Sequence, residues 1–132
     1  MAKFDFSVYK GRDWTYYAAY LKRFTKNPKK IFEMGSGTGL FLEACRMNGI
    51  EAIGCELEEE GVAAAKSRGL QVHKHDLADP LTFVGSDSFD AVFCNQVIEH
   101  VSTAAQENII KEAYRILKPG GEFLVQSPCR HY

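Results

Sequence analysis

The sequence predicts an α/β protein with a mainly parallel β-sheet and helices on both faces. Short apolar segments alternate along the chain with segments whose apolar residues recur at helical spacing. Glycine follows the first two helical patterns after the glycine-rich turn, at Gly49 and Gly69, where a helix is expected to stop. Parallel strands need long right-handed crossover connections, so the intervening helices cover the sheet on both sides.

Each element follows from its local pattern. Strands are expected over residues 30–34, 51–56, 70–75, 89–95 and 122–126. Helices are expected over residues 14–24, 39–48, 57–68 and 103–117. Asp13 can cap the first helix, and Thr103 with Gln106 forms a capping box for the last. Residues 76–87 are predicted to be a loop, and residues 118–121, KPGG, to end the last helix before the fifth strand.

The apolar faces of two helices are expected to pack on the sheet. In the first helix the stripe consists of Trp14, Tyr17, Ala18, Leu21 and Phe24, and in the last of Ile109, Ile110, Ala113, Ile116 and Leu117.

Composition indicates one soluble domain over residues 1–132, with an N-terminal helical segment (1–28) and a core (29–132). The hydrophobic content is 45%, the charged content 25% and the net charge −1, which favours neither nucleic acid nor an anionic membrane. The sequence lacks an apolar run of membrane-spanning length and a signal peptide. We therefore expect a cytoplasmic protein with reduced thiols.

The cysteines and histidines do not predict a metal site. Cys45, Cys55, Cys94 and Cys129 form no C-x-x-C pair and have no ligand-like spacing with histidine. His73 and His75 share one strand face, but two histidines without a third ligand are more often structural.

A glycine-rich turn, GSGTG at residues 35–39, joins the first core strand to the next helix. Glycine permits positive φ and close approach of a ligand, and the helix N-terminus adds N–H groups and a positive dipole. The dinucleotide fingerprint G-x-G-x-x-G would need its third glycine at Leu40 or Leu42, so it fails. The pattern present is E-x-G-x-G-x-G, from Glu33 to Gly39.

At this loop the sequence resembles the class I S-adenosylmethionine (SAM)-dependent methyltransferases, in particular the small-molecule branch that includes ubiquinone and menaquinone C-methyltransferases. Residues 89–101, FDAVFCNQVIEHV, resemble the family's motif IV region, and residues 116–121, ILKPGG, its turn before the fifth strand. The resemblance covers residues 30–126. It implies a Rossmann-like three-layer sandwich with strand order 3-2-1-4-5, SAM as cofactor and S-adenosylhomocysteine (SAH) as product.

The resemblance also implies that cofactor contacts come from the ends of successive strands. The expected residues are Glu33, Gly35, Ser36, Gly37, Thr38, Gly39, Glu56, Leu57, Asp76, Leu77, Asn95, Gln96 and Val97. The loop would wrap the methionine and ribose, and the Asn95 carbonyl would face the ammonium group. Glu56 could accept both ribose hydroxyls, with a helix-cap glutamate as the alternative. Asp76 would accept from the adenine amino group beside the Leu77 N–H, or simply cap a turn.

The implied reaction transfers a methyl group to a small-molecule acceptor, by proximity and desolvation rather than through a metal. His100 and His131 are weak general-base candidates. The preferred interpretation is that Glu99 and His100 are polar residues that hold the loop. The helix at 14–24 is a candidate lid. One alternative is a SAM-binding fragment or inactive module without its acceptor half. A nucleotide-dependent oxidoreductase and a nucleic-acid methyltransferase are disfavoured, the latter because NQVI lacks the N/D-P-P-Y/F pattern.

The family's core continues after the fifth strand with an antiparallel hairpin that this sequence, ending at Tyr132, lacks. The edge at residues 123–125 would then expose free N–H and C=O groups, which pair readily with another chain. We therefore expect either a longer natural protein or a homodimer formed through this edge.

Overall fold

Five parallel strands form one sheet in the order β3-β2-β1-β4-β5 in the computed structural model, which describes residues 4–127. The strands are β1 (Lys30–Met34), β2 (Glu51–Glu56), β3 (Val72–Lys74), β4 (Phe89–Asn95) and β5 (Leu117–Gln126). The helices are α1 (Trp14–Leu21), α2 (Leu40–Met47), α3 (Glu59–Ser67) and α4 (Thr103–Ile116), with short 3-10 segments η1 (Phe6–Tyr9) and η2 (Ile98–His100). This confirms the predicted fold class and strand order.

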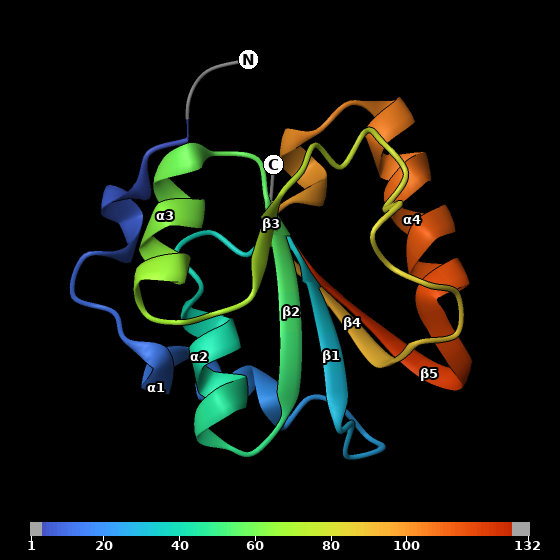
Figure 1. Ribbon diagram of the computed structural model, residues 1–132, viewed down its shortest axis with the longest axis horizontal. Helices are drawn as coiled ribbons and strands as arrows, with labels where there is room; N and C mark the ends of the chain where they lie inside the picture. Colours follow the sequence, from blue (N-terminus) through green and yellow to red (C-terminus); the bar gives the residue numbers. More distant parts are fainter. Residues whose placement is uncertain (1–3, 128–132) are drawn as a thin grey trace, which may run out of the picture.

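The sheet lies between two helical layers. Helices α1, α2 and α3 cover one face, and α4 covers the other together with the connection from β3 to β4 (Figure 1). Side chains alternate along β1, so Ile31 packs with α1 and α2 while Phe32 and Met34 join the core beneath α4. Glu33 follows the same alternation and is buried on the α2 side. Between residues 4 and 127, no helix combines the length and apolar character needed to cross a membrane.

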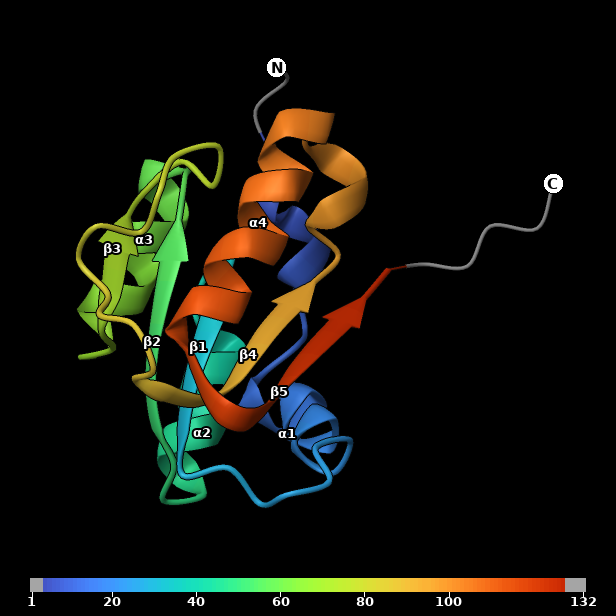
Figure 2. The ribbon, with the colours of Figure 1, turned by 90° about the vertical axis from the view of Figure 1, so that its right-hand side faces the viewer.

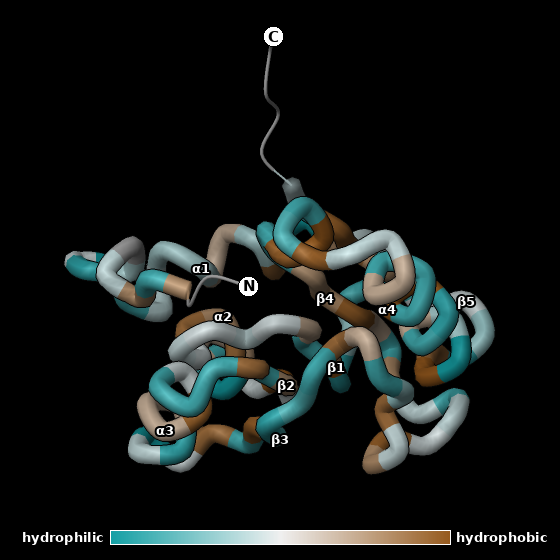
Figure 3. The backbone as a smooth tube through the Cα atoms, turned by 90° about the horizontal axis from the view of Figure 1, so that it is seen from above, coloured by the Kyte–Doolittle hydropathy of each residue, from teal (hydrophilic) through white to brown (hydrophobic). Residues whose placement is uncertain are grey.

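The carboxyl ends of all five strands lie at one edge of the sheet, because the strands are parallel. Figure 2 shows the arrowheads pointing the same way, and Figure 3 looks onto this edge from above. The loops that follow β1, β2, β3 and β4 meet here. Ligand sites of open α/β sheets form at this edge.

Helix α1 ends at Leu21, three residues before the predicted end, although its cap is as expected. The Asp13 carboxylate accepts from the Thr15 N–H, and Phe24 is buried beyond the helix. The chain leaves the helix early because the Thr25 N–H donates to the carboxylate of Glu122 on β5. The bond to Glu122 replaces a further helical turn.

The predicted capping box of α4 is wrong by one residue. Ser102 is the N-cap and its hydroxyl accepts from the Ala105 N–H, whereas Thr103 is already helical. The Gln106 side chain donates to the carbonyl of Ile98 instead of returning to the cap. The predicted apolar stripe of α4 is also wrong at Ile110, which is 57% exposed.

The last helix ends just before residues 118–121, as predicted, but the fifth strand begins earlier than expected. Strand β5 starts at Leu117, and these residues form an irregular beginning of the strand. Phe89 on β4 lies opposite Leu117, but Ala91, two residues on, lies opposite Glu122. Gly120 absorbs the extra length with a φ of +81°.

Candidate functional site

The glycine loop at residues 35–39 is held by the end of the neighbouring strand β2. The N–H groups of Gly35 and Ser36 both donate to the carbonyl oxygen of Cys55, each at 2.9 Å. The Gly37 N–H donates to Oε1 of Glu56 at 2.9 Å. These donors are therefore used within the protein, and they are not left to bind an anion.

Two side chains pack against the loop at its glycine positions, where the backbone carries no Cβ atom. Gly35 and Gly37 have φ values of +76° and +57°. A Cβ atom on Gly35 would lie 2.4 Å from Cγ2 of Val97, and one on Gly37 would lie 2.7 Å from the hydroxyl oxygen of Tyr9. Glycine is needed at both positions because the loop after β4 and the N-terminal segment approach the backbone this closely.

Gly39 allows close packing and is not part of a cavity wall. Its N–H donates to the carbonyl of Ser36, and its φ of +89° starts α2. A Cβ atom here would lie 2.9 Å from Cβ of Ala65 and 2.8 Å from Cδ1 of Leu70. The residue lets α3 and the following segment pack against the loop.

A cleft of about 750 Å³ opens above the loop. Nine of the thirteen predicted residues line it: Gly35, Gly37, Glu56, Leu57, Asp76, Leu77, Asn95, Gln96 and Val97. Parallel strands bring these residues together although they are spread over the sequence.

Three further predicted residues, Glu33, Ser36 and Thr38, line a separate cavity of about 20 Å³ beneath the loop. Oε1 of Glu33, Oγ of Ser36 and Oδ1 of Asn95 are buried there without a hydrogen-bond partner among residues 4–127. The cavity has room for about one water molecule. Its oxygen-rich lining suits a water molecule or a cationic group.

Glu33 is the most deeply buried acidic side chain of this region, at 4% exposure. Burial, and secondarily the negative charge of Glu56, raise the pKa of Glu33 well above its ordinary value. A buried carboxylate that lacks a cation is costly to ionise. The position therefore favours a positively charged ligand nearby.

Glu56 lies on the cleft wall and its ribose role stays a prediction, while the N-cap of α3 is Glu58 and not Glu56. The Glu56 carboxylate faces the cleft and also accepts from the N–H groups of Gly37 and Glu58, each at 2.9 Å. Burial raises the pKa of Glu56 despite these hydrogen bonds. Each carboxylate oxygen keeps a second lone pair, so ribose hydroxyls could still bind.

Asp76 likewise combines two roles. Its Oδ1 accepts from the Ala78 N–H at 2.9 Å, which is the predicted turn cap. The residue also lines the cleft, beside Leu77.

The chain turns sharply after β4. Gln96 has a φ of +55°, uncommon for a glutamine, and its N–H donates to the carbonyl of Gln126 at 2.7 Å. His100 lines the cleft, with its Nε2 3.5 Å from Oε1 of Glu99. His131, the other base candidate, lies outside the described residues. His75 also lines the cleft, although the sequence did not point to it.

The N-terminal segment contributes an aromatic wall, of which sequence reasoning offered the helix at 14–24 as a candidate lid but did not single out these residues as part of the site. It consists of Phe4, Tyr9, Tyr16, Tyr17 and Tyr20, and it lines the cleft opposite the strand ends. The guanidinium of Arg12 lies 4.4 Å from the centre of the Tyr16 ring. The density of aromatic residues before position 21 was the available signal. Helix α1 therefore both packs on the sheet and covers the cleft.

Charges on the cleft wall are mostly negative. Among residues 4–127, the lining contains the carboxylates of Asp5, Glu56, Glu58 and Asp76 and the guanidinium of Arg12.

Fold and sequence together define a class I SAM-dependent methyltransferase. Residues 32–125 match a family model described as a methyltransferase domain, and the chain belongs to this family. The predicted resemblance is thereby confirmed, and SAM is the cofactor of this class.

Curated relatives include the ubiquinone biosynthesis O-methyltransferase of Pseudomonas putida strain F1, which is 31% identical over 99 residues. The corresponding protein of Pseudomonas syringae pathovar tomato strain DC3000 is 29% identical over 103 residues. Each match covers 71% of this chain and 42% of the relative. The chain thus spans less than half the length of these curated relatives.

Solved structures share the fold. A SAM-dependent methyltransferase from Thermotoga maritima, described as a possible histamine N-methyltransferase, has a TM-score of 0.67 and 28% identity, over 91% of this chain and 54% of that one. A sugar N-methyltransferase from Streptoalloteichus has a TM-score of 0.76 over 97% of this chain and 57% of that one. At 23% identity, the second likeness shows the fold alone.

The buried Glu33 predicts that Glu33→Gln stabilises the ligand-free protein at neutral pH. Because the folded-state pKa is raised, ionisation of Glu33 costs stability as the pH rises above its ordinary value of 4.5. The glutamine variant avoids this loss, so its advantage should grow with pH, by at most about 1.4 kcal/mol per pH unit. Urea unfolding of both proteins at a series of pH values measures the difference.

Glu112→Gln is the matched contrast, because Glu112 is also buried. Burial raises its pKa, but hydrogen bonds from Arg115 and the Leu81 N–H outweigh this and lower it. This variant should lose about 1–3 kcal/mol at neutral pH and approach the wild type in acid. Parallel pH profiles for the wild type and Glu33→Gln would contradict the interpretation of Glu33.

Proposed function

We propose that this chain binds SAM in the cleft and transfers its methyl group to a small-molecule acceptor. The observation that carries the proposal is the buried carboxylate of Glu33, which has no hydrogen-bond partner among residues 4–127, next to a glycine loop whose Gly35, Ser36 and Gly37 N–H groups have acceptors within the protein. SAM carries two positive groups, a sulfonium and an ammonium, and both are favoured near carboxylates.

The lining fits the parts of this cofactor. Gly35, Gly37 and the carbonyl of Asn95 would hold the methionine end, with Glu33 compensating its charge from below. Glu56 would accept the ribose hydroxyls, and Asp76 with Leu77 would meet the adenine ring.

A dinucleotide fits less well. Its pyrophosphate needs N–H donors from the glycine loop, and those of Gly35, Ser36 and Gly37 already have acceptors within the protein. Two phosphate charges would also face the carboxylates of the cleft wall. Electrostatics and geometry therefore agree with the failure of the dinucleotide fingerprint.

When bound, SAM supplies a methyl group activated by the sulfonium. The protein's own residues would orient the reactants and exclude water, with Tyr9 and Val97 closing over the loop. The aromatic wall offers apolar surface to an acceptor with a planar or apolar body. If the acceptor must lose a proton, two histidines of the described cleft wall, His100 and His75, are available as the base.

A small-molecule acceptor is supported by the acid-rich cleft, which disfavours nucleic acid. The matched relatives named for ubiquinone biosynthesis and sugar methylation point the same way. A cytoplasmic location belongs to the same proposal. A SAM-binding module without its acceptor half stays the alternative.

The first prediction from this function is that the protein binds SAM or SAH but not NAD. Calorimetric titration with all three ligands measures it. Binding of NAD without a response to SAM or SAH would overturn the proposal.

Gly37→Val should abolish SAH binding while the fold persists. Its Cβ atom would meet the Tyr9 hydroxyl and project where the loop faces the cleft. Gly49→Val is the matched control, because Gly49 also has a positive φ, +72°, but a Cβ there meets nothing within 4 Å. Both variants should lose roughly 1–2 kcal/mol of stability through backbone strain. Retained SAH affinity in a folded Gly37→Val protein would make the loop purely structural.

We also propose a homodimer through the outer edge of β5. In the described part of the chain, no strand pairs with this edge, and Val125 is 41% exposed. The segment from Arg23 to Lys26 contacts the side chains of Glu122 and Gln126 and the carbonyl of Gly120. These contacts hold both ends of β5, so the middle of the edge is the surface left for a second copy.

Val125→Lys should shift such a dimer towards monomer, because a charged side chain discourages edge pairing. Met47→Lys is the control, since Met47 is an exposed apolar residue at the end of α2, which packs against α1 and β2. Light scattering across a concentration series measures the molar mass of the protein in solution. A wild-type protein that remains monomeric at high concentration rules the dimer out.

A further inference from the structure

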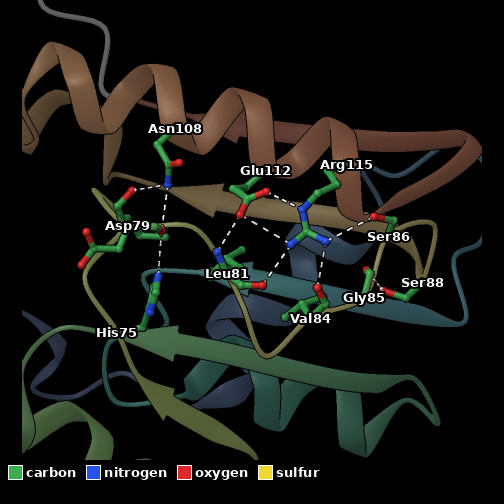
Figure 4. A network of polar contacts seen from close by, with 11 residues as sticks. His75, Asp79, Leu81, Val84, Gly85, Ser86, Ser88, Asn108, Glu112 and Arg115 are labelled. Carbon is green, nitrogen blue, oxygen red and sulfur yellow. Dashed lines mark hydrogen bonds and ion pairs between the residues drawn. The ribbon is translucent and has the colours of Figure 1, made fainter.

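Three polar side chains of α4 share one stripe of the helix and face the connection between β3 and β4. Asn108, Glu112 and Arg115 are spaced i, i+4 and i+7, which places them on the same side. Figure 4 shows this stripe pointing at residues 75–88, which contain no helix or strand. The connection is thus attached to α4 by side chains.

Glu112 and Arg115 fix the second half of the connection. Oε1 of Glu112 accepts from the Leu81 N–H at 2.6 Å, and its Oε2 accepts from Nε of Arg115 at 2.6 Å. Arg115 also donates to the carbonyls of Leu81 and Val84, each at 2.9 Å. Leu81 and Val84 are buried in the same core as Ile109 of α4. This half therefore has both polar and apolar anchors.

Asn108 alone supplies the polar anchor from α4 to the first half. Its Nδ2 donates to the carbonyls of Leu77 and Asp79, each at 2.9 Å. Nε2 of His75 approaches the same Asp79 carbonyl at 2.9 Å, and the Asp79 N–H donates to the carbonyl of Asp76 at 3.0 Å. One amide group thus holds the turn that carries Asp76 and Leu77.

That turn forms part of the cleft wall. Asp76, Leu77 and His75 all line the cleft, whereas Asn108 does not. The backbone of residues 76–79 has no sheet partner of its own, so its position depends on these contacts. Loss of the Asn108 amide would leave two carbonyls without this donor while Glu112 and Arg115 still anchor the rest.

We propose that Asn108 is a positioning residue for the adenine end of the cofactor site, acting through the turn at residues 76–79. The inference rests on the proposed function, because it assigns that turn to the adenine ring. Asn108 touches no ligand itself. Its effect should therefore be specific for the base and not for the methionine or ribose.

The experiment measures base discrimination by calorimetry. The wild-type protein is titrated with SAH and with S-inosylhomocysteine, in which a carbonyl replaces the adenine amino group. Wild type should prefer SAH, because the adenine amino group can donate to the Asp76 carboxylate, whereas the carbonyl that replaces it is an acceptor and would repel that carboxylate. In Asn108→Ala this preference should fall about 5- to 20-fold, the loss expected for a misplaced hydrogen bond.

Asn48→Ala is the matched control. Asn48 also donates its side-chain amide to a carbonyl, that of Ala44 at 2.8 Å, but it lies at the end of α2. This variant should keep the wild-type preference. Asn108→Asp, which keeps the shape and removes the donor, serves as a second variant if Asn108→Ala does not fold.

The outcomes separate the two proposals. Failure of the wild type to bind SAH overturns the proposed function and, with it, the inference. Wild-type binding without base preference overturns only the inference, since no adenine contact would remain to be positioned. An unchanged preference in both folded Asn108 variants, or an equal loss of affinity for both ligands, also overturns it, because a merely structural role would not change discrimination.

Discussion

The hydrogen bonds from the glycine loop to the end of β2 are the constraint on which the site depends. They turn the chain from β1 into α2, and they use N–H groups that a phosphate would otherwise require. With the loop fixed, Tyr9 and Val97 can pack onto its bare backbone from opposite segments of the chain. The cleft above the loop is therefore shaped by a contact between two adjacent parallel strands.

Two buried glutamates, Glu112 and Glu33, have different roles in this protein. Glu112 is ion-paired and hydrogen-bonded, and it secures the β3–β4 connection against α4. Glu33 has an oxygen without a partner among the described residues, directly beneath the loop. Burying an unpaired carboxylate lowers the stability of the folded protein, and a bound ligand can offset this loss. An unpaired buried carboxylate therefore marks a binding site more strongly than a paired one.

Sequence reasoning recovered the fold from local patterns and the rule for parallel sheets, and the family resemblance supplied the strand-end residues that line the cleft. It missed Phe4 and Tyr9 on the cleft wall, because residues 4–12 show no period from which a position in space could be derived. It also misplaced the buried face of α4. Ile110 is exposed and Glu112 is buried, where Glu112 accepts from the Leu81 N–H of the connection and from the guanidinium of Arg115 on the same helix.

The sequence by itself determined the parallel α/β architecture, the glycine loop and the family. Hydrophobic periodicity and glycine placement are local properties, and they are sufficient for the architecture and the loop. The family followed from the resemblance of residues 33–39, 89–101 and 116–121 to known motifs. Only the tertiary structure decided that Gly39 serves helix packing, that Glu33 lies in a separate cavity, and that Asn108 holds the turn after β3. These roles arise from contacts between residues far apart in the chain, whose geometry depends on how the layers pack.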